Sequence, residues 1–162
     1  MRFLPKVAAL LCATAMPAMA NPYRMISTDS LARAIEDTGT SIVYDSDICY
    51  EDTDIHGYYL LEYDGDTIIK DELGMCVENH KVGDYRELGD TLRHEAIHVA
   101  QACNDHEAIL PWNQLANYAT RQQLSIVQRY PAEDQHRELE ATVGARRLTN
   151  DQVATVLKRI CQ

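Results

Sequence analysis

The second half of the chain carries apolar residues at the three- and four-residue spacing of amphipathic helices. The first such stretch follows Tyr85, and its apolar face consists of Leu88, Leu92, Ala96, Val99, Ala100 and Cys103. A second helix is expected between Pro111, which suits a helix start, and Pro131, which ends it. The apolar positions of this second helix are Leu115, Ala119, Ile126 and Val127.

Two further helices are expected near the end of the chain. One runs from about Glu133 to Arg147. The other begins at Thr149-Asn-Asp-Gln152, a capping-box pattern in which each end of the motif can bond the other's backbone. Its apolar positions are Val153, Val156, Leu157 and Ile160.

The first half has a different pattern, with short runs of β-branched and aromatic residues between turn residues. Strands are expected over 41–44, 58–63 and 67–69, with a hairpin turn at Asp64-Gly65 and one more short strand over 75–77. A short helix over 28–37 precedes them, with Asp29 or Ser30 as its cap. We therefore expect an α+β fold, in which a small antiparallel sheet is followed by a helical bundle.

The first twenty residues have the pattern of a secretory signal peptide. Arg2 and Lys6 form a short basic head, and residues 7–15 are largely apolar. Ala18-Met19-Ala20 provides small residues on both sides of one position, as signal-peptide cleavage sites do. The apolar run is too short to anchor the chain in a bilayer. We expect cleavage after Ala20, with no membrane anchor left and a secreted or periplasmic location.

Residues 21–162 are of a length that suits a single domain. The whole chain has 15 Lys and Arg against 25 Asp and Glu, a net charge of −10. Nucleic acids and anionic membrane surfaces attract cationic proteins, so this charge disfavours both as partners.

The cysteines indicate an oxidising compartment. Cys12 lies in the expected signal peptide, which leaves an even number, four, in the exported chain. These four allow three pairings, of which we favour Cys49–Cys76 in the strand region and Cys103–Cys161 between two helices. None of them has CxxC spacing, so a cysteine-based zinc site is not expected.

The first long helix carries an HExxH motif, His94-Glu95-Ala96-Ile97-His98. Residues four apart lie on one helix face, so both imidazoles can bind the same ion. Glu95 lies beside them, where it can accept a proton from a water molecule on the metal. The motif predicts a Zn²⁺ site with His94 and His98 as ligands and Glu95 as the general base.

A catalytic zinc needs a third protein ligand. The extended motif HExxHxxGxxH does not apply, because Gln101 and Asn104 occupy its last two defined positions. Asp105, His106 and His136 are further candidates, although each is expected to lie on the surface.

The segment Glu138-Leu139-Glu140-Ala141 on the third long helix supplies better candidates. With this segment and the HExxH motif, the chain resembles the gluzincin metallopeptidases, in which a glutamate from a later helix completes the site. The resemblance covers two helices, and it implies a zincin-like fold and hydrolysis of peptide bonds. It also implies an edge strand before the HExxH helix, along which an extended substrate lies. Residues 75–78 are the expected edge strand.

Two glutamates compete for the role of third ligand. Residues two apart on a helix point about 200° apart, so Glu138 and Glu140 cannot both bind one ion. Gluzincins often carry an aspartate four residues after the glutamate, where it supports a histidine ligand. That position is Thr142 counted from Glu138 and Gly144 counted from Glu140. Because Thr142 can form a hydrogen bond, we favour Glu138 and keep Glu140 as the alternative.

Several other polar residues are candidates for supporting roles. Gln101 lies three residues after His98 on the same helix face and can hydrogen-bond a ligand or a substrate carbonyl. His56 and His80 lie in turn-rich stretches, where exposure is expected. Possible hydrogen-bond donors to a developing oxyanion are Tyr58, Tyr59, Tyr85 and Tyr130.

Together these features predict an exported zinc-dependent metallopeptidase that acts on a peptide or protein substrate. A second hypothesis is a secreted zinc-binding or interaction module, held by disulfides, that binds the metal without turnover. A third is a structural domain without a metal.

Overall fold

The computed structural model describes residues 22–23 and 29–162, so the expected signal peptide lies outside the described residues. The structure confirms the α+β class. Its elements are α2 (Ser30–Glu36), β1 (Ser41–Tyr44), α3 (Asp47–Glu51), β2 (Gly57–Asp64), β3 (Thr67–Met75), the 3₁₀ helix η1 (Val77–Asn79), α4 (Tyr85–Cys103), α5 (Trp112–Tyr118), α6 (Arg121–Val127), α7 (Gln135–Arg147) and α8 (Asn150–Ile160).

The three strands form one sheet in the order β1-β3-β2. β2 and β3 are the arms of the expected antiparallel hairpin, with Gly65 in its turn at a φ of +59°. β1 pairs with β3 in parallel, so the sheet is mixed rather than purely antiparallel. A parallel partner needs a crossover, and the chain provides one through α3 and β2 between the two strands.

The central strand β3 is longer than its side chains suggest. Lys70, Asp71 and Glu72 interrupt the apolar pattern, and the expected strand therefore stops before them. In the structure Glu72 pairs with Ser41 on one side and Leu60 on the other. Backbone pairing with β2, and at Glu72 also with β1, thus keeps this polar stretch in the sheet.

The helical half follows the expected order, with one difference. The stretch between the two prolines forms two short helices, α5 and α6, separated at Ala119-Thr120. Thr120 accepts a hydrogen bond from the backbone of Gln123, and the Gln123 side chain accepts one from the Thr120 backbone. This capping box starts a new helix within the apolar pattern.

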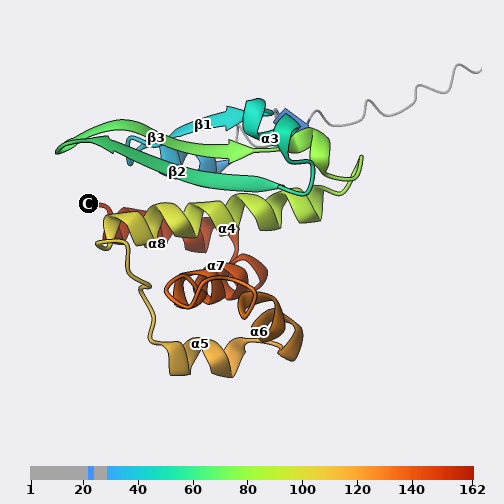
Figure 1. Ribbon diagram of the computed structural model, residues 1–162, viewed down its shortest axis with the longest axis vertical. Coiled ribbons are helices and arrows are strands. Elements are labelled where there is room, and N and C mark those ends of the chain that lie inside the picture. The colour runs from blue at the N-terminus through green and yellow to red at the C-terminus, as the bar shows by residue number, and fades with distance from the viewer. Residues whose placement is uncertain (1–21, 24–28) are drawn as a thin grey trace, which may run out of the picture.

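Helix α4 lies between the sheet and the helices α5, α6 and α7 (Figure 1). One side of α4 contacts β2 and β3, and the other contacts α7, while α8 packs beside it and against α2. Its buried residues Leu88, Leu92, Ala96, Val99 and Ala100 belong to the main core. A second, smaller core lies under α5 and α6, around Leu115, Val127, Leu139 and Val143.

Both expected disulfides are present. Cys49–Cys76 joins α3 to the end of β3, and Cys103–Cys161 joins the last residue of α4 to the end of α8. They fit an extracellular protein. Among the described residues, no helix has the length and apolar character that a membrane span requires.

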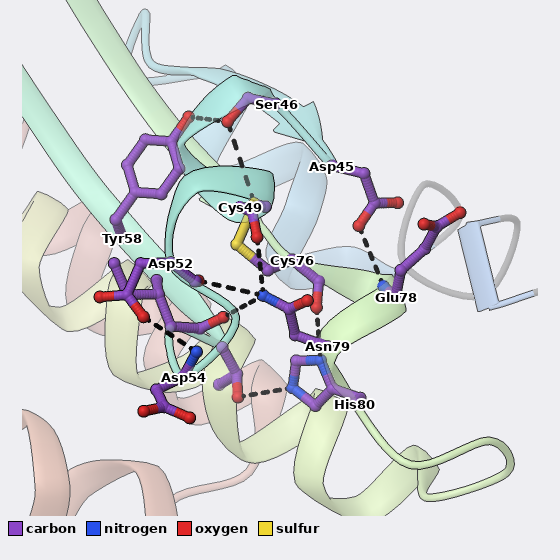
Figure 2. The surroundings of a disulfide bond; sticks show 12 residues. Asp45, Ser46, Cys49, Asp52, Asp54, Tyr58, Cys76, Glu78, Asn79 and His80 are labelled. Carbon is purple, nitrogen blue, oxygen red and sulfur yellow. Dashed lines mark hydrogen bonds between the residues drawn. A yellow bond between two sulfur atoms is a disulfide. The ribbon is translucent and has the colours of Figure 1, made fainter.

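The region around the first disulfide is a dense polar network (Figure 2). The Asn79 side chain donates hydrogen bonds to the backbone oxygens of Cys49 and Ile55, at 3.1 and 2.8 Å. His80 lies between Cys76 and Thr91: its Nδ1–H donates to the Cys76 oxygen at 2.9 Å, and its Nε2 accepts from the Thr91 hydroxyl at 3.0 Å. The loop that precedes β2 is thereby attached to α4.

The expectation that His80 is exposed is wrong, since the residue is only 8% exposed. Its turn-rich sequence context gave no sign that both ring nitrogens find partners, one of them on α4. His56, by contrast, keeps 40% of its side chain exposed, and its ring lies 4.7 Å from that of His80.

The two disulfides should make similar contributions to stability. The bonded cysteines are separated by 27 residues in Cys49–Cys76 and by 58 in Cys103–Cys161. Loop-closure entropy then predicts losses of about 3.5 and about 4 kcal/mol in the free energy of unfolding when each cysteine pair is replaced by serine. Urea denaturation of the two double variants measures these losses. Mass spectrometry of the untreated protein should show no free thiol at these four cysteines, and detection of one would contradict the pairing.

The buried His80 should make stability depend on pH. Burial lowers the pKa of His80, and the nearby His56 lowers it further. The unfolded chain, with a histidine pKa of about 6.5, therefore binds the proton more readily, and stability is lost as the pH falls below that value. We expect His80→Gln to lose less stability than wild type between pH 7.5 and pH 5, measured by urea denaturation. The exposed His106→Gln should keep the wild-type pH dependence, and an equal flattening in both variants would contradict this role of His80.

Candidate metal centre

Three side chains from two helices converge at one point. The Nε2 atoms of His94 and His98 on α4 lie 3.2 Å apart. The Glu138 carboxylate on α7 approaches both, with its oxygens 3.5 Å from the Nε2 of His94 and 3.4 Å from that of His98. These atoms form a group that could hold a metal ion.

The spacing of these atoms fits zinc. Ligands at 2.0–2.1 Å from a tetrahedral zinc lie about 3.3–3.4 Å from one another. The three distances among His94, His98 and Glu138 span 3.2–3.5 Å, with a different carboxylate oxygen facing each histidine, and each distance is close to the edge length of such a tetrahedron. Two imidazoles and one carboxylate are also a ligand set found in catalytic zinc sites.

The other candidate ligands lie elsewhere. Among the described residues, the group of His94, His98 and Glu138 is the one cluster of three side chains with metal-ligand geometry. Asp105 and His106 are exposed in the loop after α4. The His136 ring is hydrogen-bonded to the backbone oxygen of Leu110 at 2.8 Å.

Gln101 determines which nitrogen of His98 faces the site. The amide nitrogen of Gln101 donates to the Glu140 carboxylate at 2.9 Å and to the backbone oxygen of Arg137 at 3.1 Å. Both partners only accept, so the amide oxygen of Gln101 must face His98, whose Nδ1 lies 2.8 Å away. Nδ1 of His98 is then the protonated nitrogen, and the lone pair of Nε2 points toward His94 and Glu138. This is the tautomer that a metal requires.

Glu140 holds this arrangement in place from the opposite face of α7. Its carboxylate is 5% exposed and accepts three hydrogen bonds, from the Gln101 side chain and from the backbone N–H groups of Ile109 and Leu110. A buried carboxylate needs such partners to offset its lost hydration. Glu140 therefore fixes Gln101 and also ties the segment before α5 to α7.

Glu95 lies under the start of β2, 7% exposed. A Cβ atom at Gly57 would come within 3.0 Å of the Glu95 Cγ and 2.6 Å of the Thr91 Cγ2. The missing side chain at Gly57 thus lets the strand pack directly on α4 beside Glu95. Burial raises the pKa of Glu95 to about 7, while the neighbouring His94 opposes the rise. A carboxylate with this pKa can both accept and return a proton near neutral pH.

Two of the converging side chains are in their metal-binding protonation states. Burial and the adjacent His94 lower the pKa of His98 to about 4, so this imidazole is neutral at pH 7. Burial alone would raise the pKa of Glu138, but the hydrogen bond from His94 and the charges of His94 and Arg137 bring it below its usual value. A neutral imidazole and an ionised carboxylate are the forms that bind zinc.

The site opens into a cleft made of two adjoining hollows of about 430 and about 400 Å³. The two hollows share Gly57, His94, Glu95 and Tyr130, so they extend from the histidines in two directions. The first also contains Tyr58, Tyr59, Gln101, His106, Asp134, Arg137 and Glu138, and the second His56, Glu87, Asp90, Thr91, Thr142 and Arg146.

The strand that borders this cleft is β2, not the expected segment 75–78. Met75 ends the central strand β3, and residues 77–79 form the 3₁₀ helix η1. β2 is an outer strand of the sheet, and its residues Gly57 to Tyr59 line the cleft. The sequence pattern marks β2 as a strand, but strand order depends on pairing between distant segments.

Among the four candidate tyrosines, Tyr130 stands out by its position. Burial raises the pKa of Tyr130, as do the charges of Glu138 and Glu95 and a hydrogen bond from its hydroxyl to Glu138. The Tyr58 hydroxyl instead donates to Glu72 at 2.6 Å. Tyr59 packs against the main core, and Tyr85 is the first residue of α4.

The position of Thr142, four residues after Glu138, predicts that it supports a histidine ligand. In the structure it does not. It borders the second hollow with His94 and Glu95, but no hydrogen bond links its hydroxyl to any described ligand. The partner of His98 is Gln101 from the same helix. The residue of α7 that supports the candidate ligand His98 is Glu140, which acts through its hydrogen bond with Gln101.

Comparison with known proteins gives one match. Residues 25–162 match the family described as "Domain of unknown function (DUF8637)", and the chain belongs to this family. No curated protein and no solved structure matches the chain.

The two glutamates on α7 should respond differently to substitution. We expect Glu138→Ala to lower zinc affinity by more than about 100-fold, because one of three ligands is lost. Glu140→Ala should lower zinc affinity by about tenfold at most, since Gln101 remains. It should instead destabilise the fold by about 3 kcal/mol, as one buried and two partly buried donors lose their acceptor. Competition with a chelating dye and urea denaturation measure the two effects, and a reversed order of zinc affinities would contradict Glu138 as the ligand.

Proposed function

We propose that this member of the DUF8637 family is an exported zinc-dependent metallopeptidase. The observation that carries the proposal is the convergence of His94, His98 and Glu138 at zinc-like spacing, with the buried Glu95 beside them and an open cleft in front. A site that only stores or buries a metal has no need of a carboxylate next to an open cleft.

The proposed roles follow from the positions of the side chains. His94 and His98 bind zinc through Nε2, and Glu138 supplies the third ligand from α7. Zinc, when bound in such a site, lowers the pKa of a coordinated water toward about 7 and polarises a carbonyl group. Gln101 keeps His98 in the tautomer and orientation that binding requires.

Glu95 is the proposed general base. It accepts a proton from the water that attacks the scissile carbonyl carbon, and it transfers that proton to the departing amine nitrogen. The C–N bond breaks as the new C–O bond is completed, so water is consumed and a carboxylate and an amine are released. The pKa of about 7 that burial gives Glu95 suits both transfers.

The cleft supports a peptide as the substrate. β2 is an outer strand of the sheet and its first residue lines both hollows, and a peptide in extended conformation can pair with the free edge of such a strand. Tyr130 lines both hollows beside Glu138, and its hydroxyl is the proposed donor to the charge that develops on the carbonyl oxygen of a substrate.

The proposed location is outside the cytoplasm, secreted or periplasmic. Two disulfides and the signal-peptide pattern of residues 1–20 both point to export.

The competing function is zinc binding without turnover, in a secreted module stabilised by disulfides. It uses the same three ligands, and the two disulfides are compatible with it. The role of Glu95 separates the two functions, because a storage or structural site does not depend on a general base.

Glu95→Gln should separate catalysis from metal binding. Glutamine keeps the size of the side chain but cannot take up the proton at neutral pH. We expect one zinc per chain and a melting temperature near wild type, with hydrolysis of a quenched fluorescent peptide library reduced by at least about 100-fold. Glu107→Gln, an exposed change in the loop after α4, should leave all three quantities unchanged.

Two outcomes would overturn the proposal. If Glu95→Gln cleaves the library as fast as wild type, Glu95 is not the base. If the zinc-loaded wild type cleaves no peptide, the module without turnover is the better description.

A further inference from the structure

A separate hollow, distinct from the two that form the cleft, lies on the far side of α7 from the metal centre. Its volume is about 600 Å³, larger than either part of the cleft. It is enclosed by α4, α5, α7, α8 and the segment that connects α4 to α5, which Figure 1 shows as a long loop between these layers. We call it the apolar cavity. Its lining residues are Ile97, Ile109, Leu110, Leu115, Tyr118, Glu140, Val143, Gly144, Arg147, Leu148, Val153, Val156, Arg159 and Ile160.

The apolar cavity is separate from the cleft. None of His94, Glu95, His98 and Glu138 lines it. Glu140 does, but its carboxylate already accepts three hydrogen bonds, from Gln101 and from two backbone N–H groups. The rest of the interior is apolar, and a cavity of this size is typical of a binding site for a small molecule.

The lining determines the kind of molecule that fits. Apart from Glu140 and two arginines, every lining residue is aliphatic, aromatic or glycine. A peptide segment would bring backbone N–H and C=O groups into this interior, where they would lack partners and lose hydration. An unbranched hydrocarbon chain has no such groups and gains from burial.

The two arginines lie where the cavity meets solvent. Arg147 and Arg159 both line the cavity and both are exposed. Arg147 is positioned by Tyr118: two of its N–H groups donate to the Tyr118 backbone oxygen, and its guanidinium lies 5.4 Å from the ring centre. Its remaining N–H groups are available to a ligand. The Arg159 guanidinium forms no ion pair with any described residue.

Two cations at the mouth of an apolar cavity, in a chain with a net charge of −10, indicate an anionic head group. Guanidinium groups bind carboxylates with paired, charge-assisted hydrogen bonds. We infer that the apolar cavity binds one long-chain fatty acid, with its hydrocarbon chain between α4, α7 and α8 and its carboxylate at Arg147 and Arg159. This site does not depend on the metal centre or on the proposed peptidase activity.

Laurate and dodecanol test the inference, because they share the hydrocarbon chain and differ in the head group. Isothermal titration of the disulfide-bonded protein should show one laurate bound per chain, with dodecanol at least tenfold weaker. Arg159→Glu should weaken laurate binding by at least tenfold. Its matched control, Lys158→Glu, changes a neighbouring exposed cation of α8 that does not line the cavity, and should stay within twofold of wild type.

A cavity-filling variant gives an independent check. Val156→Trp adds bulk from α8 into the cavity and should abolish laurate binding, whereas Thr155→Trp, on the exposed side of the same helix, should not. Melting temperatures show whether both variants fold. If Val156→Trp does not fold, the comparison of Arg159→Glu with Lys158→Glu still tests the inference. His94→Ala should bind laurate as wild type does, so failure of this inference is distinguishable from failure of the zinc site.

Several results would overturn the inference. They are an absence of saturable laurate binding, equal binding of laurate and dodecanol, and equal losses in Arg159→Glu and Lys158→Glu. Tighter binding of the peptide acetyl-Ala-Leu-Leu than of laurate would assign the cavity to a peptide terminus. A dimer in sedimentation that laurate does not dissociate would assign it to a second copy of the chain.

Discussion

The packing of α7 against α4 is the contact on which the candidate site depends. His94 and His98 are positioned by α4 alone, but Glu138 reaches them only because the two helices approach closely. Gly144 permits this approach, since a Cβ atom there would lie 2.4 Å from the Cδ1 of the buried Ile97. A residue with a Cβ atom at 144 would require the end of the Ile97 side chain to move.

Buried polar groups stabilise the packing of α7 on α4 because their polar atoms are hydrogen-bonded to partners within the protein. The Glu140 carboxylate, placed between α4 and α7, joins Gln101 to the backbone of the segment before α5. On the other side of α4, His80 connects the disulfide-bonded loop to Thr91, and Gly57 lets β2 lie against Glu95. Each of these hydrogen bonds and contacts restricts the movement of an element that borders the cleft. The result is a group of candidate ligands held from both sides of one helix, as preorganised sites require.

Much of the fold was predictable because its signals are local. The three- and four-residue spacing identified α4, the capping box at Thr149 identified the start of α8, and the Asp64-Gly65 turn identified the hairpin of β2 and β3. The prediction failed where pairing or capping overrode the apolar pattern. The strand β3 continues through Lys70, Asp71 and Glu72 because all three pair with the backbone of β2 and Glu72 also pairs with β1. Thr120 divides one expected helix into two.

In the candidate site too, local sequence signals predict one part and tertiary packing decides the other. The sequence by itself determined that His94 and His98 share a face, with Glu95 beside them, because an α-helix sets the direction of residues four apart. It limited the third ligand to a short segment of α7, but only the tertiary structure placed Glu138 at the histidines and turned Glu140 toward Gln101. That choice depends on how α7 is rotated about its axis when it packs on α4. The rotation is set by contacts such as Gly144 with Ile97, between residues far apart in the chain, and no local pattern encodes it.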